Sequence, residues 1–250
     1  MTMTEVDSSR DYNHENEETP ALTVMFDIDN CILETDKVIE KRILDKFPDI
    51  KKKLPEEGYD KIIDTFDFPD EETLNKTREF INELLDPSNA NNIWNDLPAI
   101  EDSIETLNSL HKQGVDVVLA TGRSTTLKDV TRKNLVSLGL ELSIADSISY
   151  KRQDLLGKDA VSEHKNQVAE VRKAIVNVDD SPENARRLRD NPANTLQSIL
   201  FTTRQNTGAK EIDDIVRARN WKEVETLVLQ IKNALEIRPD LSPYHQPVSK

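Results

Sequence analysis

In Val24-Met25-Phe26-Asp27-Ile28-Asp29-Asn30-Cys31-Ile32-Leu33, an apolar run meets two acidic residues and then resumes. The apolar residues between positions 21 and 28 do not alternate with polar ones, which is typical of a strand buried on both faces of a parallel sheet. Ligands of open α/β sheets bind outside the carboxyl ends of the strands. Asp27 and Asp29 are therefore predicted to lie in a ligand-binding crevice, and a hydrolase or phosphotransferase is the first hypothesis.

The composition limits the possible partners. The 250-residue chain can form one core and a smaller accessory module. Its 33 basic and 47 acidic side chains give a net charge of −14, which argues against long nucleic acids, because phosphate backbones are bound by Lys and Arg. A small phosphorylated substrate is compatible with this charge if a metal ion and a local cluster of basic side chains make the electrostatic potential at the site positive.

Cys31 is the only cysteine, which excludes a disulfide within the chain and a cysteine-rich zinc site. Neither the first twenty residues nor any later segment has the apolar length of a signal peptide or membrane span. We therefore expect a soluble, cytoplasmic protein with no membrane partner. The oligomeric state does not follow from the sequence.

Changes in composition divide the chain into segments. The N-terminal segment is polar, and it has too few apolar residues to offset the conformational entropy that ordering would cost. A charged segment with several prolines interrupts the core after the first strand. The predicted segments are a disordered tail at 1–20, a core at 21–34 and 98–205, a helical insert at 35–97, a C-terminal helical extension at 206–236 and a loose tail at 237–250.

Helix and strand patterns alternate through the core, which predicts an α/β fold with a parallel sheet between helices. The predicted strands are 21–28, 115–120, 142–150, 174–178 and 198–201. The predicted helices are 37–47, 59–66, 71–85, 99–113, 126–138, 159–172 and 182–189. The apolar stripe from Trp221 to Leu235 predicts a last helix that packs on the core.

Three more groups of residues follow or flank buried strands. Thr121-Gly122-Arg123-Ser124 follows the second strong strand, Lys165 lies in the helix before 174–178, and Asp179-Asp180-Ser181-Pro182 follows that strand. Taken singly, the first group is consistent with a turn, Lys165 with a solvated lysine, and the third group with the acidic start of a helix. Their shared position beside strand ends indicates one site.

Phosphoryl transfer explains why carboxylates gather there. A carboxylate can attack phosphorus and form an aspartyl-phosphate, and Asp27 is the candidate nucleophile. Two anions meet in that step, so a hard cation such as Mg²⁺ is needed. The predicted metal ligands are Asp27, Asp29, Asp179 and Asp180.

Other groups must hold the phosphoryl oxygens and move protons. A hydroxyl, a loop N–H and an ammonium group stabilise the transition state, and Thr121, Gly122 and Lys165 suit these roles. Asp29 is predicted to protonate the leaving oxygen and later to activate water.

These motifs resemble those of the haloacid dehalogenase (HAD) superfamily. Its four-part signature is matched by Asp27-Ile28-Asp29, Thr121-Gly122-Arg123, a lysine and Asp179-Asp180. The resemblance implies a Rossmann-like core, Mg²⁺ and phosphatase activity through an aspartyl-phosphate. In this superfamily phosphatases carry the second aspartate that dehalogenases usually lack, so Asp29 favours a phosphatase. The insert at 35–97 occupies the place of the first (C1) type of cap.

The segment around the lysine is similar to that of 5'(3')-deoxyribonucleotidases, so a nucleotidase-like substrate is the leading hypothesis. Lys165 is favoured as the phosphate-contacting lysine, and Lys158, which starts the same helix, is the alternative. Arg123 and Lys158 are predicted substrate contacts. The superfamily implies that Asp180 contacts the metal directly and that Asp179 is a second ligand or acts through water.

Asn30 stands where glycine is common in the superfamily, and asparagine is the next residue most tolerant of left-handed backbone. Cys31 is predicted to be a small buried residue. A cap would exclude water and contact the leaving group, and some of its aromatic residues would face the substrate while most pack in the core. These residues are Phe47, Tyr59, Phe66, Phe68 and Trp94.

Three other functions stay open. Tyr150-Lys151-Arg152-Gln153-Asp154 is loosely similar to the polynucleotide 3'-phosphatase half of end-healing enzymes, although the acidic charge disfavours polymers. A non-catalytic HAD-like binding protein is the second alternative, but both Asp27 and Asp29 are retained. A phosphotransferase that uses an acceptor other than water is the third.

Overall fold

The computed structural model describes residues 22–53, 62–89, 92–157, 159–191, 197–203, 206–207 and 215–237. The predicted tail at 1–20, Tyr59, Lys158 and the tail beyond residue 237 lie outside these residues. Within the described part of the chain, no helix is both long enough and apolar enough to cross a membrane.

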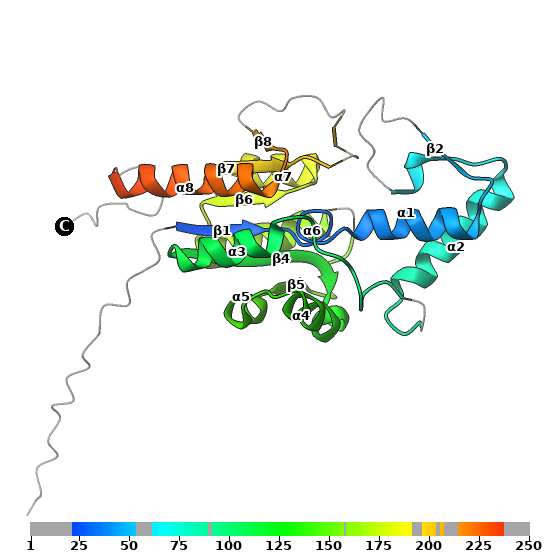
Figure 1. Ribbon diagram of the computed structural model, residues 1–250, viewed down its shortest axis with the longest axis horizontal. Helices are drawn as coiled ribbons and strands as arrows, with labels where there is room; N and C mark the ends of the chain where they lie inside the picture. Colours follow the sequence, from blue (N-terminus) through cyan, green and yellow to red (C-terminus); the bar gives the residue numbers. More distant parts are fainter. Residues whose placement is uncertain are drawn as a thin grey trace, which may run out of the picture.

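A six-stranded parallel sheet forms the centre of the molecule (Figure 1). The strands are β1 (Leu22–Phe26), β4 (Val115–Ser124), β5 (Ser149–Lys151), β6 (Val176–Asp179), β7 (Gln197–Phe201) and β8 (Val216–Ala218). Their order is β5-β4-β1-β6-β7-β8, and every neighbouring pair is parallel. The predicted α/β, Rossmann-like fold with a central first strand is confirmed.

Helices cover both faces of the sheet. They are α3 (Ser103–Lys112), α4 (Lys128–Ser137), α5 (Leu142–Asp146), α6 (Ala160–Arg172), α7 (Pro182–Asp190) and α8 (Trp221–Ile237), with a short 3₁₀ turn, η2 (Thr125–Leu127), before α4. α3 and α8 contact each other, and α6 and α7 contact each other. Leu22, Val24 and Phe26 of β1 join the core cluster that includes α3 and α8, whereas Met25 joins a second cluster with residues of α6 and α7.

The strand order reverses at β1. β4, which follows β1 in the chain, lies on one side of it, and β6 lies on the other. The connections diverge at this point, and such a switch point is where open α/β sheets bind ligands. The fold therefore brings the residues after β1, β4 and β6 to one place.

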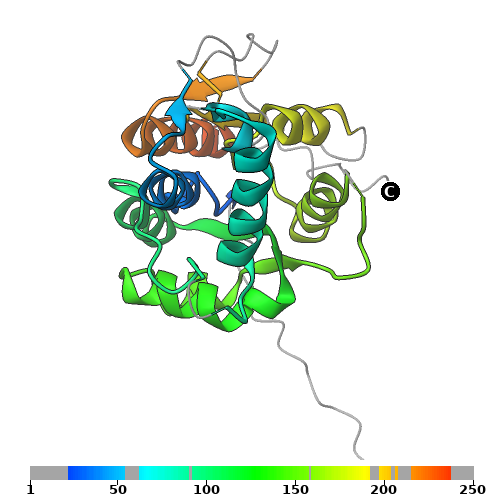
Figure 2. The same ribbon diagram turned by 90° about the vertical axis from the view of Figure 1, so that its right-hand side faces the viewer.

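The insert between β1 and α3 contains α1 (Thr35–Lys46), β2 (Lys51–Lys52), η1 (Ile62–Thr65), β3 (Phe66–Asp67) and α2 (Glu71–Leu85). α1 and α2 lie beyond the carboxyl ends of the strands (Figure 1), and Figure 2 shows α2 across that end of the molecule.

The insert is not helical throughout. The helix predicted at 59–66 is wrong in its described part, because a 3₁₀ turn at 62–65 leads directly into β3. The Thr65 hydroxyl donates to the Ile62 carbonyl at 2.7 Å and closes this turn. β3 pairs with β2 in an antiparallel ribbon, which the Lys53 amide extends by donating to the Thr65 carbonyl at 2.9 Å.

One predicted boundary and one predicted strand are wrong. α3 begins at Ser103 and not at Ala99, since Ala99 pairs with Leu33 and Asp102 has a left-handed backbone with φ 64°. The strand predicted at 142–150 is α5 followed by β5, and α5 buries Ile144 and Ala145 as a strand would have done. β8 was not predicted, because three residues carry too little pattern.

α8 is fixed to the rest of the core by Trp221. Its ring stacks on Phe26 with the centroids 5.7 Å apart, and it also contacts Phe201 at 5.8 Å. Its Nε1 donates to the Cys31 carbonyl at 2.9 Å. Val224 and Val228 are buried as well, so the prediction that this stripe packs on the core is confirmed, as is the burial of Cys31.

Candidate active site

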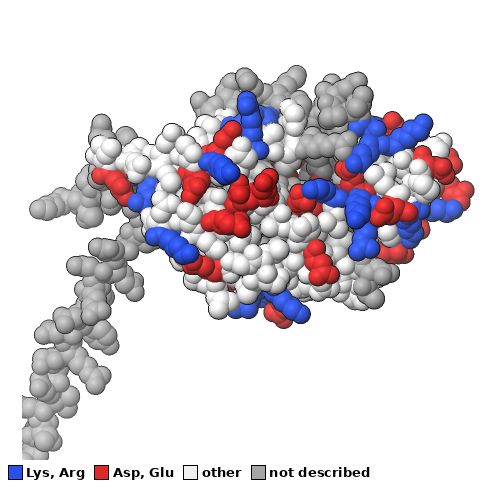
Figure 3. Space-filling model, in the orientation of Figure 1, with Lys and Arg blue, Asp and Glu red and all other residues white. Residues whose placement is uncertain are grey.

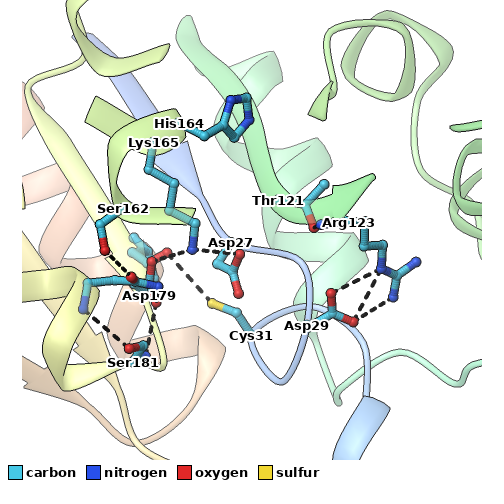
Figure 4. A network of polar contacts seen from close by, with 12 residues as sticks. Asp27, Asp29, Cys31, Thr121, Arg123, Ser162, His164, Lys165, Asp179 and Ser181 are labelled. Carbon is cyan, nitrogen blue, oxygen red and sulfur yellow. Dashed lines mark hydrogen bonds and ion pairs between the residues drawn. The ribbon is translucent and has the colours of Figure 1, made fainter. Parts of the chain in front are cut away.

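The loop after β1 sends its two aspartates to different partners. Asp27 continues the pairing with β6, because its amide donates to the Val178 carbonyl at 2.9 Å. Asn30 has a left-handed backbone with φ 57°, as the sequence predicted. Asp27 points toward Lys165, and Asp29 points toward Arg123 on the other side of the loop (Figure 4).

Asn30 also ties this loop to the start of α1. Its Nδ2 donates to Asp36 Oδ2 at 2.7 Å, and its Oδ1 accepts from the Asp36 amide at 2.8 Å. The amides of Ile32 and Leu33 both donate to the Ile28 carbonyl at 2.9 Å. The loop is therefore closed internally and leads into α1 with a defined geometry.

Lys165 is the positive charge at the centre of the site. Its side chain is 2% exposed, and its Nζ lies 2.8 Å from Asp27 Oδ1 and 2.6 Å from Asp179 Oδ2. α6 brings this ammonium group between the ends of β1 and β6. It forms a buried ion pair with both carboxylates, so each charge depends on the others.

Asp27, Asp179 and Asp180 form a group of carboxylates whose nearest oxygens all lie within 4.8 Å of one another. Burial raises the pKa of Asp27 to about 7, with Asp179 and Asp29 adding to the effect and Lys165 opposing it. Burial, followed by the charges of Asp27 and Asp179, also raises the pKa of Asp180 well above its usual range.

One ammonium group does not balance three carboxylates. Although burial disfavours its charge, Asp179 and Asp27 hold the pKa of Lys165 above its usual value, so Lys165 remains protonated. An all-oxygen, negatively charged donor set is the type that hard divalent cations such as Mg²⁺ prefer. The residues therefore fit the predicted metal, except that the Asp29 carboxylate is outside this group.

Asp179 is held by several donors. Its Oδ1 accepts from the Ser181 amide at 2.9 Å and from Asn184 Nδ2 at 3.4 Å. Asn184 in turn accepts from the Ser162 hydroxyl at 2.7 Å, and Ser181 caps α7. The predicted N-cap Ser181 and Asp179 are thus parts of one network.

Asn206 holds the backbone of Asp180. Its Nδ2 donates to the carbonyls of Asp180 and Phe201, both at 2.7 Å, and its Oδ1 accepts from the Thr203 amide at 3.0 Å. Asn206 is 3% exposed. It therefore links the loop after β6 to the end of β7.

Asp29 is bound by Arg123 and Thr35. Arg123 Nε donates to Oδ2 at 3.0 Å and Nη2 donates to Oδ1 at 2.7 Å, while the Thr35 hydroxyl donates to Oδ1 at 2.5 Å. Burial alone favours the neutral acid, but the charge and hydrogen bonds of Arg123, with Thr35, hold the pKa of Asp29 below its usual value. Asp29 is therefore kept ionised.

Thr121 and Gly122 lie at the end of β4. Thr121 is fully buried, and its hydroxyl accepts from the Arg123 amide at 3.2 Å. A Cβ at position 122 would lie 3.1 Å from a methyl group of Val161, so glycine allows β4 to approach the first turn of α6. Lys158 lies outside the described residues, whereas Lys165 is in the site.

The sequence reasoning missed Thr35 and Asn206. Thr35 starts α1 six positions after Asp29, and that short separation is the one signal that could have indicated the contact. Asn206 gives no local signal, because its contacts depend on how β6 and β7 lie in the sheet.

Comparison with known protein families gives one match over most of the chain. The family described as "5' nucleotidase, deoxy (Pyrimidine), cytosolic type C protein" matches residues 21–234 of this chain. No curated protein gives a significant match.

Many solved structures share the fold. A HAD family hydrolase from Deinococcus radiodurans R1, with bound phosphate and sodium, is 13% identical, with 85% of this chain and 97% of that chain covered and a TM-score of 0.54. A protein from Clostridium difficile, provisionally described as a phosphatase, is 17% identical, with coverage of 82% and 97% and a TM-score of 0.56. At these identities the similarity supports the fold alone.

Proposed function

Since this chain belongs to the cytosolic type C deoxy (pyrimidine) 5' nucleotidase family of HAD-type phosphatases, we propose that it hydrolyses a small, nucleotide-like phosphomonoester with Mg²⁺. The observation that carries the proposal is the position of Asp27. It lies at the sheet switch point, beside a buried ammonium group and within the carboxylate cluster, and the ionised Asp29 follows two positions later.

Asp27 is the proposed nucleophile. Its carboxylate oxygen attacks phosphorus, the bond to the leaving oxygen breaks, and Asp29 protonates that oxygen. Water then attacks the phosphorus of the aspartyl-phosphate while Asp29 accepts a proton from the water, and inorganic phosphate leaves. Asp29 is ionised in the free site, so the proton of a monoanionic substrate is the proposed source for the first transfer, and the proton that Asp29 later takes from water passes to solvent when phosphate leaves.

The charged side chains around Asp27 make this attack feasible. Lys165 keeps a positive charge beside the nucleophile, and Thr121 with the Gly122 amide is proposed to contact the phosphoryl oxygens. Held by Asp27, Asp179 and Asp180, Mg²⁺ would supply the charge that lets a carboxylate approach a phosphate.

We propose that the insert at 35–97 acts as the cap, with the core at 21–34 and 98–205 and the C-terminal extension at 206–236. Its helices lie over the end of the sheet that carries the site, which supports this division (Figure 2). A cap in that place favours substrates small enough to be enclosed. A cytoplasmic location is proposed from the family description.

A polynucleotide substrate is not supported. Lys151 Nζ donates to the Leu155 carbonyl at 3.2 Å, and Arg152 pairs with Asp154 at 2.5 Å. On the face seen in Figure 3, acidic and basic side chains of the described residues are interspersed and form no continuous basic surface. Such a surface is what binding to nucleic acid backbones requires.

A phosphate-release screen tests the proposed function. It compares nucleoside monophosphates, sugar phosphates, phosphoamino acids and 3'-phosphorylated oligonucleotides, each with Mg²⁺ and with EDTA, and uses Asp27→Asn as the blank. We expect Mg²⁺-dependent release from nucleoside monophosphates that the variant lacks. No release from any class would contradict the proposal, and transfer only to an added alcohol would indicate a phosphotransferase.

A further inference from the structure

Arg123, a predicted substrate contact, uses each of its three guanidinium nitrogens in a hydrogen bond within the protein. Its side chain is 2% exposed, and its Nε and Nη2 form a bidentate pair with Asp29. Its remaining terminal nitrogen, Nη1, donates to the Thr131 hydroxyl of α4 at 2.9 Å. A guanidinium group held in this way presents its fork to a carboxylate and not to a phosphate.

Trp94 covers the face of the same guanidinium group. The Arg123 Cζ lies 4.6 Å from the centroid of the Trp94 ring, within the range of a cation–π contact. Trp94 belongs to the insert, is 6% exposed, and its Nε1 donates to the Leu85 carbonyl at the end of α2 at 3.0 Å. The ring is therefore fixed to α2 at one side and to Arg123 at the other.

Asp29 is held by two neighbours and stays partly exposed. Arg123 binds both of its carboxylate oxygens and Thr35 binds Oδ1, while the side chain keeps 28% exposure. These contacts leave the carboxylate partly accessible but allow it little rotation. A proton-transfer group must lie within hydrogen-bond reach of the reacting oxygen, and a displacement of about 1 Å can cost about 100-fold in rate.

We propose that Trp94 and Arg123 are positioning residues that hold Asp29 for proton transfer and connect the insert to that step. The inference rests on the proposed function and refines it. Trp94 orients the guanidinium plane, the guanidinium group orients the carboxylate, and displacement of α2 therefore displaces the acid and base. Arg123 acts through Asp29 and does not touch the phosphoryl group.

Leaving-group dependence tests the proposal. The kcat/KM value reports the steps from free enzyme and substrate to the phosphoenzyme. In that reaction an alkoxide leaving group needs a proton from Asp29, whereas a nitrophenolate leaving group does not. We expect Arg123→Gln to lower kcat/KM for a nucleoside 5'-monophosphate about 100-fold. For p-nitrophenyl phosphate the loss should stay within about threefold, and inhibition by inorganic phosphate should be unchanged, because phosphate binding is intact.

Conservative variants test whether the loss of activity reflects a general loss of structure. Arg123→Lys keeps the charge without the fork and should fall between wild type and Arg123→Gln with the nucleotide. Trp94→Leu should reproduce the selective loss in weaker form, and Trp94→Phe should lose less than Trp94→Leu. Arg132→Gln removes an exposed arginine paired with Asp146 and is the matched control.

The outcomes separate the two proposals. Equal losses with both substrates, together with weaker phosphate inhibition, would show that Arg123 binds phosphate and would overturn the inference alone. Equal losses with unchanged phosphate inhibition would also overturn it, because they indicate a general structural role. A wild-type enzyme that hydrolyses neither substrate contradicts the proposed function and this inference with it.

Discussion

At the scale of single residues, the site depends on one buried lysine. Lys165 compensates Asp27 and Asp179 where water cannot. Its position in the helix before the third strong strand made it a candidate from the sequence. Its two ion pairs could not be predicted, because they depend on how α6 packs on the sheet. Removal of one partner leaves the other charges buried without compensation, which is more costly than the absence of the whole pair.

Lys165→Met should therefore destabilise the protein strongly. We expect a loss of about 3–5 kcal/mol in the free energy of unfolding, measured by denaturant titration without metal. Lys222→Met is the matched control, since Lys222 pairs with Asp102 on the surface and such pairs contribute about 0–1 kcal/mol. Similar small losses for both variants would contradict the assignment of a buried, essential counter-charge.

At the scale of elements, the connections carry as much of the site as the strands do. The loop from β1 to α1 has its shape because Asn30 adopts a left-handed backbone and binds Asp36 at the start of α1. The left-handed turn could be predicted from residue type. The side-chain bond to α1 could not, because it requires the direction in which the insert leaves the core.

Asn30→Ala and Asn30→Gly separate these two contributions. Both variants lose the bonds to Asp36, but only alanine suffers the left-handed strain, so Asn30→Ala should be less stable than Asn30→Gly by about 1–2 kcal/mol. Denaturant unfolding of both measures the difference. Equal stabilities would mean that the loop relaxes to another backbone conformation.

Asn206 should affect metal binding through the backbone of Asp180. Partners behind a metal ligand typically change metal affinity by about 10–100-fold, so Asn206→Ala should raise the Mg²⁺ concentration needed for half-maximal activity by at least about tenfold. The matched control is Thr207→Val, which changes an exposed neighbour whose hydroxyl donates to the Thr203 carbonyl. An unchanged Mg²⁺ requirement in Asn206→Ala would remove this role.

At the scale of the whole molecule, the parallel sheet and the place of the site followed from the alternation of apolar strands and amphipathic helices. The order of the strands could not be predicted in this way, because it depends on crossover connections that local sequence patterns do not reveal. β8 has only three residues, and α5 has a pattern compatible with either element type. The contacts of Trp94 and Arg123 join segments that only the folded chain brings together.

Metal binding should stabilise the whole molecule. A ligand at 100 times its Kd adds about 2.7 kcal/mol to a folded state that alone binds it, so saturating Mg²⁺ should raise Tm and EDTA should reverse the rise. Asp180→Asn weakens the carboxylate group and should reduce the shift. A shift as large in Asp180→Asn as in wild type would place the cation elsewhere.

The sheet order also bears on how the chain folds as it is synthesised. β1 pairs with β4 and β6, so Leu22 leaves the ribosome well before its partner Val115 and still earlier than Val176, which pairs with Val24. At bacterial to eukaryotic elongation rates the wait for β4 is about 5–20 s. Through that time the five residues of β1 that the fold later buries have no sheet partner, and they expose apolar surface of the kind that chaperones protect from aggregation.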